Sequence, residues 1–599
     1  MDTQHFSNLV FVQANKFGNK TALYHKVGSD STWSEISWKQ LADKVFVIAK
    51  ALTELGVSEQ DRVGQFSQNM AENLIVDFAL YANRAIMVPM YATSSEEQVD
   101  FITKHSNIEV IFVGDQTQYD IACKVEKSSG VIKRIISFDP NVKLCDDIAS
   151  MYYSELEALG EKSNRHFEVH QRQQEANEND LACILYTSGT TGNPKGVMMP
   201  HSCFLEAMKI HKARLTTITA DDKSVAFLPL SHVFERTWSY FLMYMGASNY
   251  INLKPLEIQQ TLKEIRPTLM CAVPRFWEKV YAGVQENISK MTPFMMGIVT
   301  WAVATGKKHN LDYLRIGKKP GLLLKIKYAI ADKLIFSKVK KTLGIENANM
   351  FPVAGARLSD EILVFFRSIG VPITYGYGLT ESTATVCCFD YTGFEVGTVG
   401  LIMPDLEVKI GEDNEILLKG KTIFPGYYKN DEANKAAFTE DGWFKTGDAG
   451  YLKGKQIVLT ERIKDLFKTS NGKYIAPQEI ETRLILDVYI EQAAVIGDER
   501  NFVTAIIAPN IEALENYAKK NKLVYSSIEE LLKLPKIIEL MDERIKNAQK
   551  GMANYEIIKK FSLIKRGFSI ETGELTNTLK MRRAVIMQKY KQLIDEMYV

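Results

Sequence analysis

An eleven-residue loop, Tyr186 to Gly196, carries the residue types best suited to chemistry in this sequence. It reads YTSGTTGNPKG and follows an apolar run of strand length at 181–185. Its glycines allow backbone N–H groups to approach an anion without interference from a Cβ atom. Its hydroxyls and lysine add donors and a positive charge, and the residues that we expect to face the anion are Thr187, Ser188, Gly189, Thr190, Thr191, Gly192 and Lys195. The loop therefore suits a polyphosphate.

This loop differs from the common phosphate loop GxxxxGK[ST]. The GK[ST] run of this chain is at 420–422, and Glu415 stands where that motif requires its first glycine. A nucleotide hydrolase of the P-loop type is therefore disfavoured. The nine histidines form no HExxH motif, so the sequence gives a zinc hydrolase no support either.

A second loop, YGYGLTE at 375–381, joins an aromatic ring, a hydroxyl and a carboxylate at the end of another apolar run. A carboxylate beside a phosphate loop would repel the ligand unless a cation lay between them. Mg²⁺ prefers oxygen ligands and suits that position. The two loops together predict a site for a metal-bound polyphosphate.

Four further motifs carry charged or titratable groups: LPLSHVFER at 228–236, GWFKTGD at 442–448, ERIKDLFK at 461–468 and LTNTLK at 575–580. Each taken alone has an ordinary explanation, such as a core histidine or a solvated charged turn. Together and in this order, the motifs resemble those of the adenylate-forming, AMP-binding superfamily. Its members include acyl-CoA synthetases, luciferases and the adenylation domains of peptide synthetases. The resemblance runs from about residue 10 to residue 590.

The resemblance implies a binding site for ATP and AMP. Tyr377 would pack on the adenine ring, and Asp448 would accept hydrogen bonds from both ribose hydroxyls. Arg462 would also contact the ribose. The segment that contains Gly355 and Ala356 would flank both the adenine and the acyl pocket.

The same resemblance implies how the phosphates are handled. Thr380 would contact the α-phosphate, and Glu381 would bind Mg²⁺ with Thr187 as a second ligand. Lys580 would be the catalytic lysine, near the phosphates during adenylate formation. Together with Lys195 these groups would stabilise the negative charge that develops on the phosphate oxygens.

The resemblance also implies a moving C-terminal domain. Lys464 occupies the family's hinge position, Lys468 lies beside it in the motif, and His232 would line the acyl and thiol sites in an orienting role. Two residues depart from the family pattern: Glu461 stands where a glycine is usual, and Asn577 replaces a proline. The first departure concerns the local geometry of the hinge.

The motif LPLSHVFER, the run VPRFWEKV at 273–280 and a basic insertion at about 281–345 resemble the long-chain fatty acyl-CoA synthetase branch. The implied reaction is ATP-dependent activation of a fatty acid to acyl-AMP, followed by transfer to coenzyme A. Alternatives are a fatty acyl-AMP ligase that loads a carrier protein and an enzyme that adenylates another aryl or acyl acid. A catalytically silent relative or an oxygen-dependent luciferase-like enzyme are further alternatives.

The elements that must position these motifs predict an α/β protein of two domains. Strand-like runs near 86–89 and 110–113 alternate with helical patterns such as 36–56, which indicates βαβ units in stacked αβ subdomains. Further strand candidates precede the motifs, at 181–186, 224–230, 268–273, 350–353 and 371–375.

Later segments predict the remaining divisions of the chain. The polar segment 159–180 predicts a surface connector, and short strands with glycine turns predict a small β subdomain at about 401–463. We place the N-terminal domain at 1–463. A mobile α+β domain would occupy 464–599, with the hinge at Lys464.

Composition excludes several classes of protein. The 599 residues have 73 basic and 72 acidic side chains, so there is no excess of charge to hold nucleic acid. An apolar fraction of 46% argues against a disordered chain. The odd number of seven cysteines and the absence of a CxxC pair favour a reducing compartment, and hence a cytoplasmic location.

Residues 307–341 contain eleven lysines and arginines but only two acidic residues. Apolar residues are interleaved near helical spacing: Leu322, Leu323, Ile326, Ile330 and Leu334. One interpretation, slightly favoured, is an ordinary helix whose apolar face packs on the core. The other is an amphipathic helix on anionic lipid, which would place the protein peripherally on the cytoplasmic face of a membrane.

Overall fold

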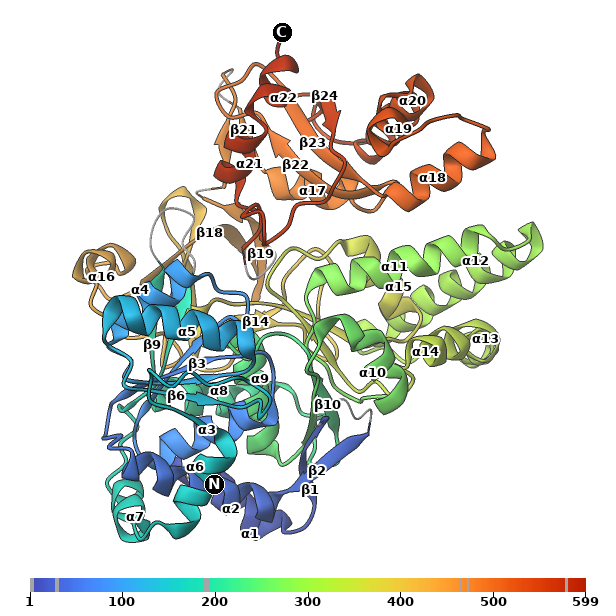
Figure 1. Cartoon of the computed structure of the whole chain (residues 1–599). Helices are drawn as coiled ribbons and strands as arrows, with labels where there is room; N and C mark the ends of the chain where they lie inside the picture. The colour runs from blue at the N-terminus through green and yellow to red at the C-terminus, as the bar shows by residue number, and fades with distance from the viewer. Residues whose placement is uncertain (1–4, 27–31, 188–193, 464, 471–472, 577–579) are drawn as a thin grey trace.

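The computed structural model describes residues 5–26, 32–187, 194–463, 465–470, 473–576 and 580–599. A large N-terminal part of stacked α/β layers carries a smaller α+β C-terminal part (Figure 1). This architecture confirms the predicted fold class.

A seven-stranded sheet forms one layer of the N-terminal part. Its strands are β3 (Arg62–Phe66), β4 (Ile86–Met90), β5 (Val110–Val113), β6 (Arg134–Ser137), β7 (Ser150–Tyr152), β8 (Leu181–Thr187) and β9 (Lys195–Pro200). Their order is β7-β6-β5-β3-β4-β8-β9. The pairs from β7 to β8 are parallel, and β9 runs antiparallel to β8. Every residue of β4 and β5 is buried, as expected for parallel strands that helices cover on both faces.

Helix α2 (Trp38–Glu54) shows why the helices of this layer form where they do. Its apolar residues recur at helical spacing and are buried, as predicted from 36–56. The Ser37 hydroxyl accepts a hydrogen bond from the Gln40 N–H, and the Gln40 side-chain oxygen accepts one from the Ser37 N–H. This capping box starts the helix at Trp38. Other helices of the N-terminal part are α1 (Leu9–Phe17), α3 (Ala71–Ala82), α4 (Glu96–Ser106), α5 (Gln116–Ser129), α6 (Tyr153–Lys162), α7 (His166–Gln174), α8 (His201–Arg214), α9 (Val233–Met245) and α10 (Ile258–Ile265).

Two further sheets complete the N-terminal part. The four-stranded sheet has the order β10-β11-β1-β2, with β1 (Thr21–Lys26), β2 (Trp33–Ser37), β10 (Lys223–Ala226) and β11 (Ser248–Ile251). The eight-stranded sheet is built from β12 (Phe351–Val353), β13 (Ile373–Tyr377), β14 (Cys387–Cys388), β15 (Leu401–Ile402), β16 (Leu406–Ile410), β17 (Glu415–Gly420), β18 (Phe444–Lys453) and β19 (Gln456–Arg462). Its order is β12-β13-β14-β15-β19-β18-β17-β16, so the strands expected in a β subdomain continue the sheet of β12–β14.

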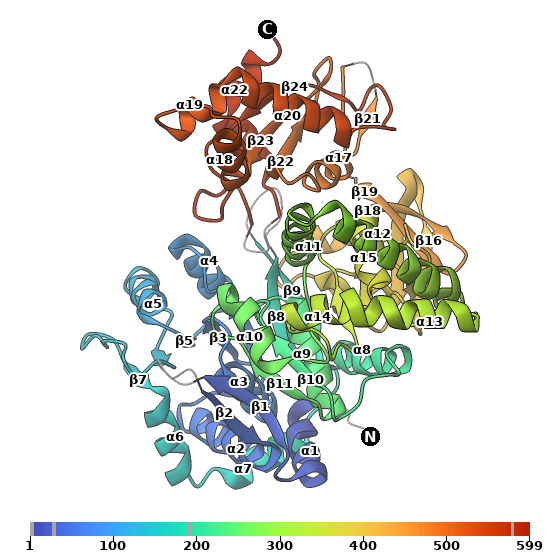
Figure 2. The same ribbon diagram turned by 90° about the vertical axis from the view of Figure 1, so that its right-hand side faces the viewer.

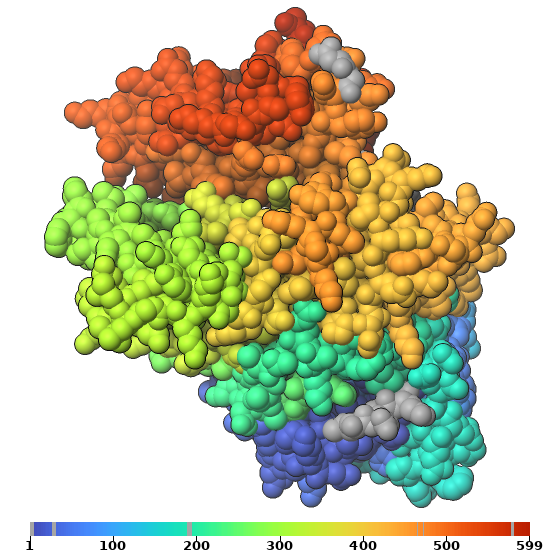
Figure 3. All heavy atoms as spheres, turned by 180° about the vertical axis from the view of Figure 1, so that it is seen from behind, coloured from blue at the N-terminus to red at the C-terminus, as the bar shows by residue number. Residues whose placement is uncertain are grey.

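The C-terminal part has a hydrophobic core of its own. Its two buried clusters contain only residues between Phe467 and Met597. A hairpin of β20 (Phe467–Lys468) and β21 (Tyr474–Ile475) precedes a sheet of β22 (Ile490–Ile496), β23 (Val503–Pro509) and β24 (Ile558–Leu563). The helices are α17 (Pro477–Leu484), α18 (Ile511–Lys520), α19 (Ile528–Lys533), α20 (Pro535–Ala548), α21 (Arg583–Lys589) and α22 (Lys591–Glu596). In the space-filling view this part, orange to red, lies directly on the N-terminal part (Figure 3).

The basic insertion is helical and lies in a lobe on one side of the molecule (Figure 2). The helices of the lobe are α11 (Pro274–Ser289), α12 (Pro293–Lys307), α13 (Leu322–Ala331), α14 (Ser337–Leu343) and α15 (Asp360–Ser368). The five apolar residues between Leu322 and Leu334 that the sequence analysis placed at helical spacing are exposed, by 44% to 76%. The favoured interpretation, that these residues face the core, is therefore wrong.

Three segments differ from their predictions for local reasons. Residues 268–273 are mostly buried but form isolated bridges rather than a strand. The predicted strand 224–230 ends at Ala226, because the Leu228 N–H donates to the Glu235 side chain and the Leu230 N–H donates to Asn69. The predicted connector 159–180 contains the end of α6 and all of α7.

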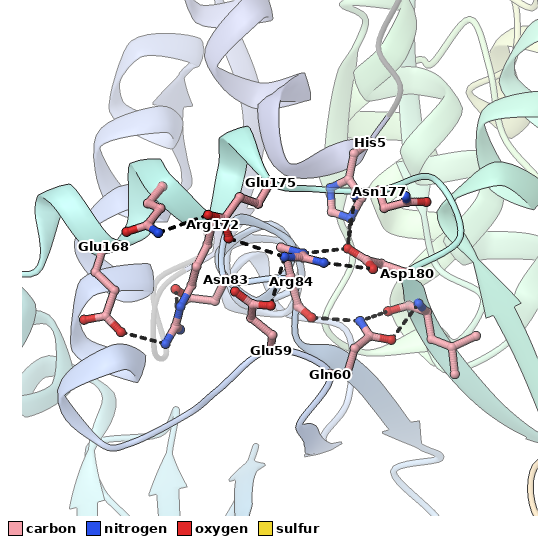
Figure 4. Close-up of polar contacts among 12 residues, drawn as sticks. His5, Glu59, Gln60, Asn83, Arg84, Glu168, Arg172, Glu175, Asn177 and Asp180 are labelled. Carbon is pink, nitrogen blue, oxygen red and sulfur yellow. Dashed lines mark hydrogen bonds and ion pairs between the residues drawn. The ribbon is translucent and has the colours of Figure 1, made fainter.

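Helix α7 forms despite its polar sequence because its charged side chains are paired (Figure 4). Arg172 lies 2.7 Å from the Glu168 carboxylate and also donates to the Val57 carbonyl. At the end of the same segment, the Arg84 Nε donates to the Asp180 carboxylate at 2.7 Å. These contacts fasten the chain just before β8, whose other end carries the phosphate loop.

Candidate active site

The pairing of β18 with β19 brings two motifs together. Asp448 is opposite Arg462 in the antiparallel register, and the Arg462 Nε lies 3.2 Å from Asp448 Oδ1. The Tyr377 hydroxyl, at the end of β13, donates to the other carboxylate oxygen at 2.6 Å. Asp448 and Tyr377 are both buried. Three of the predicted nucleotide-binding residues thus meet in one hydrogen-bonded cluster.

The loop after β13 is tightly folded around Gly378. A Cβ atom at Gly378 would lie 1.7 Å from the Ala384 carbonyl oxygen, so glycine is required for this close approach. The Val386 N–H donates to the Tyr377 carbonyl and closes the loop. Thr380 and Glu381 begin the short 3₁₀ turn η6 (Thr380–Ser382) that this loop presents.

Glu381 lies within a group that reaches back to the phosphate loop. The Tyr427 hydroxyl donates to Glu381 Oε1 at 2.9 Å, and burial raises the pKa of Glu381 above its usual value. The Lys195 ammonium lies 4.9 Å from the centroid of the Tyr427 ring. Lys195 pairs with Thr187 across β8 and β9. Tyr427 therefore lies between Glu381 and the end of the phosphate loop at Lys195. Ser188, Gly189, Thr190, Thr191 and Gly192 lie outside the described residues.

Lys580 reaches this cluster from the C-terminal part. A bridge between Leu575 and Met581 closes its loop, in which the Thr576 N–H donates to the Lys580 carbonyl and the Lys580 N–H donates to the Thr576 hydroxyl. Burial lowers the pKa of Lys580 to about 8. The positive charge of Arg462 contributes to this lowering of the pKa, while nearby carboxylates, those of Asp448 and Glu381 among them, oppose it. The predicted catalytic lysine is thus within electrostatic reach of both carboxylates.

His232 lies close enough to Lys580 to be affected by its charge. It caps α9, because its Nδ1 accepts a hydrogen bond from the Phe234 N–H at 3.2 Å. Burial lowers the pKa of His232 to about 4, and the Lys580 charge contributes to that shift. The neutral ring therefore carries its proton on Nε2, which makes it a donor rather than a base.

Gly355 and Ala356 follow β12. Gly355 has φ +95°, a conformation that favours glycine, and the Ala356 carbonyl accepts from the Tyr375 hydroxyl. The preceding residues Val353 and Ala354 line an apolar pocket, whose lining also includes Trp238, Phe241, Tyr377, Thr385 and Cys388. Tyr377 therefore borders both this pocket and the Asp448 cluster.

Apolar and polar contacts join the two parts of the protein, and Leu486 of the C-terminal part packs against the N-terminal core. The Arg275 guanidinium lies 3.7 Å from the Glu491 carboxylate, and Arg357 lies 3.6 Å from Glu479. Glu461, at the end of β19, accepts a hydrogen bond from the Gln478 N–H in the first turn of α17 at 3.3 Å. These contacts hold the C-terminal part with Lys580 facing the cluster.

The two remaining predicted residues adjoin this boundary. Lys464 lies outside the described residues. Lys468 is exposed on β20, and its ammonium lies 5.5 Å from the centroid of the Tyr474 ring. Sequence reasoning missed Tyr427, because a tyrosine after a Pro-Gly turn carries no signal that it will meet Glu381 and Lys195.

Comparison with known proteins adds independent findings. The family model described as AMP-binding enzyme matches residues 10–428, and the model for the AMP-binding enzyme C-terminal domain matches residues 464–599. The long-chain-fatty-acid–CoA ligase FadD15 of Mycobacterium bovis is 32% identical over 582 residues, which cover 95% of this chain and 93% of that protein. Fatty acyl-CoA synthetase B of Dictyostelium discoideum is 30% identical over 94% of this chain and 85% of its own length.

Solved structures share the fold. The adenylation domain of a carboxylate reductase from Mycobacterium chelonae superposes with a TM-score of 0.79 at 21% identity, covering 100% of this chain and 92% of that one. An anthranilate CoA ligase, AuaEII, in complex with anthranoyl-AMP gives a TM-score of 0.73 at 17% identity, covering 99% and 98%.

Proposed function

The chain belongs to the family of AMP-binding enzymes, and from that premise we propose that it is a long-chain fatty acid:CoA ligase that forms AMP. In the first step a carboxylate oxygen of the acid bonds to the α-phosphorus of ATP, and pyrophosphate leaves. In the second step the thiol of coenzyme A loses its proton and its sulfur bonds to the acyl carbon, while AMP leaves. The acyl substrate is supported by two relatives that match most of the chain, one named as a long-chain-fatty-acid–CoA ligase and one as a fatty acyl-CoA synthetase.

The observation that carries this proposal is the meeting of Lys580 with the cluster of Asp448, Arg462 and Glu381. The lysine would face the negative charge that accumulates on the phosphate oxygens. Asp448 would accept hydrogen bonds from the ribose, held in place by Arg462 and Tyr377. The apolar pocket beside Tyr377 would receive the start of the acyl chain.

The donor set fits a Mg²⁺ ion that is shared with the phosphates. Glu381 is a carboxylate whose raised pKa reflects burial without full charge compensation, which a bound cation would supply. Thr187 offers a hydroxyl on the far side of Lys195 and Tyr427. No group of three or more metal-ligating side chains gathers within the described parts of the chain. Mg²⁺ would therefore take its other ligands from phosphate and water, and would neutralise phosphate charge.

We further propose that the C-terminal part turns about Lys464 between the two steps. Lys580 would leave the cluster after adenylate formation and the thiol would take its place, which is gating of one site for two reactions. Neutral His232 would orient the acyl group in both steps. For the cell we propose a cytoplasmic location with peripheral contact with a membrane, where long-chain acids partition.

The test is a chain-length series of saturated acids from C6 to C18 with ATP, Mg²⁺ and coenzyme A. We expect release of AMP and pyrophosphate in equal amounts, with kcat/KM rising toward the long acids. Coenzyme A alone should suffice as the acceptor, whereas a requirement for a carrier protein would identify an acyl-AMP ligase. Formation of ADP and phosphate would overturn the proposal.

A further inference from the structure

Helix α13 has two apolar faces instead of one. Tyr328 and Ala331 lie on one side and pack against the hydrophobic core, together with Ile335 of the following π-helical turn η5 (Asp332–Phe336). The side of Ile326 and Ile330 points away, because positions 322, 326 and 330 recur every four residues on another face, and Leu334 of η5 is exposed beside it. The apolar residues of this outer face are exposed by 44% to 76%, namely Leu322, Leu323, Ile326, Ile330 and Leu334. A helix face that is exposed to solvent normally carries polar residues.

Lysines surround this outer face. Those of α13 and its flanks are all exposed, namely Lys318, Lys319, Lys325, Lys327 and Lys333. None of them forms an ion pair with another described residue. The acidic residue nearest to them on the helix, Asp332, is held by Lys340 at 3.0 Å and by the Ser337 hydroxyl. The face therefore combines bare apolar side chains with uncompensated positive charge.

The adjoining helix adds to the apolar surface of the lobe. Helix α12 exposes Phe294 by 77% and also exposes Met295 and Trp301. Within the described residues, no helix is both long enough and apolar enough to span a bilayer. A surface of this kind suits an interface of lipid headgroups and acyl chains, with leucine and isoleucine inserted and lysines at the headgroups.

We propose that the outer face of α13, with Lys318 and Lys319, docks the protein on an anionic lipid bilayer. This inference rests on the proposed function, because the proposed acyl substrate partitions into the same bilayer. Charge decides against a second copy of the chain as the occupant. A two-fold contact through this face would place lysines against lysines, whereas an anionic leaflet attracts each of them.

The experiment measures flotation of the full-length protein with liposomes of phosphatidylcholine alone and with 30% phosphatidylglycerol. We expect binding to the anionic liposomes that declines with salt, and little binding to the neutral ones. The charge variant Lys325→Glu/Lys327→Glu/Lys333→Glu should bind at least about tenfold more weakly. The apolar variant Leu323→Ser/Ile326→Ser/Ile330→Ser should lose binding at the same net charge.

A matched control changes three exposed lysines elsewhere, Lys39→Glu/Lys559→Glu/Lys560→Glu, and should bind like the unchanged protein. Equal binding of the control and charge variants would mean that net charge alone acts, and it would overturn the proposal. So would equal binding to neutral and anionic liposomes. Absence of liposome binding would also overturn the proposal. If, in that case, the apolar variant sedimented as a monomer and the unchanged protein as a dimer, the face would instead be an interface between two copies of the chain.

Activity separates this inference from the proposed function. AMP release with octanoate, ATP and coenzyme A in the absence of liposomes should be the same in all variants, because α13 contributes no residue to the candidate active site. Loss of liposome binding with retained AMP release supports the docking face. A protein that binds liposomes through α13 but releases no AMP with any acid would leave the face intact and reject the ligase.

Discussion

Lys580 is a residue whose charge depends on where its loop is docked. Outside the cluster an exposed lysine is protonated throughout the physiological range. Inside it, burial lowers the pKa of Lys580 to about 8. The side chain is therefore a cation at neutral pH but close to the point at which it loses its proton.

Lys580→Ala is expected to lower kcat/KM for acyl-AMP formation by about 100- to 1000-fold. Thioester formation from supplied acyl-AMP should be spared, because the lysine acts in the first step only. In the unchanged enzyme, kcat/KM for ATP should fall as the pH rises through about 8, since the neutral amine no longer attracts phosphate. Pyrophosphate release measures the first step and thioester absorbance the second.

Lys591→Ala serves as the control, because Lys591 is exposed in the same part of the chain. It should leave both half-reactions unchanged. An equal loss of both half-reactions in Lys580→Ala would contradict the assigned role.

At this scale the sequence motifs predicted which residues would meet, because each motif has a fixed order and composition. Asp448, Arg462 and Tyr377 form one hydrogen-bonded cluster although they come from three motifs. Tyr427 could not be predicted, since its contacts depend on how a turn folds over a loop nearly 50 positions away. Such contacts are properties of packing, which a single sequence does not display.

At the scale of elements, the junction between β19 and α17 depends on Glu461. This buried residue stands where the family pattern has glycine, and it accepts hydrogen bonds from the Arg462 and Gln478 N–H groups. Burial and, to a smaller extent, the negative charges of Glu481 and Asp465 raise the pKa of Glu461 to about 7. Arg583 pairs with Glu481 at 2.7 Å and partly offsets that charge.

Glu461→Gln should make the protein less sensitive to alkaline pH. In the unfolded chain the carboxyl ionises near pH 4.5 and in the folded protein near pH 7, so stability falls as the pH rises between these values. Above pH 7 the whole loss in the free energy of unfolding is present, about 3 kcal/mol for a pKa that is about 7 in the folded protein and 4.5 in the unfolded chain. The melting temperature of the variant should therefore match that of the unchanged protein at pH 4.5 and exceed it at pH 8.

Glu512→Gln removes an exposed carboxylate of the same C-terminal part and should show no such divergence. A Glu461→Gln protein whose melting temperature tracks the unchanged protein at every pH would contradict the buried position of this carboxyl.

Elements with strong patterns were predictable and those stabilised by polar contacts were not. Strands β4 and β5 are continuous apolar runs, and α2 has an apolar stripe with a capping box. Helix α7 is polar and depends on ion pairs such as Arg172–Glu168. The exposure of the outer apolar face of α13 could not be predicted either, because its apolar periodicity is that of a helix that packs on the core.

At the scale of the whole molecule, the described contacts between the two parts include two partly exposed ion pairs, the Glu461 hydrogen bond and the packing of Leu486. Exposed pairs contribute about 0–1 kcal/mol each. Such weak contacts suit parts that must separate in every catalytic cycle. The described arrangement, with Lys580 at the cluster, is the one that the proposed mechanism assigns to adenylate formation.

Joining the two parts covalently should separate the half-reactions. Arg275→Cys/Glu491→Cys replaces an ion pair of 3.7 Å, in a Cys145→Ser background because Cys145 is the exposed native cysteine. After treatment with a short bismaleimide, acyl-AMP formation should persist and thioester formation should fall at least about tenfold, because the cross-link prevents the rotation.

The proteins that carry only Arg275→Cys or only Glu491→Cys in the same background, treated identically, should retain both half-reactions. Undiminished thioester formation by the fully cross-linked protein would show that no rotation about the hinge is needed.

The order of the layers was predictable in outline from the alternation of strands and helices. The joining of β15 to β14 was not, because two-residue strands leave no periodic signal. The extent of the C-terminal motion is likewise absent from residue patterns, since it depends on the balance of contacts between two finished surfaces.

The position of Tyr377 has a consequence for how acids are discriminated. Tyr377 lines the apolar pocket, and its hydroxyl donates to Asp448, the carboxylate expected to bind the ribose. An acid too bulky for the pocket would therefore displace a support of the nucleotide. A poorly fitting acid should therefore raise the KM for ATP as well as binding weakly itself. Selectivity for the acid would then depend on the acid and ATP together.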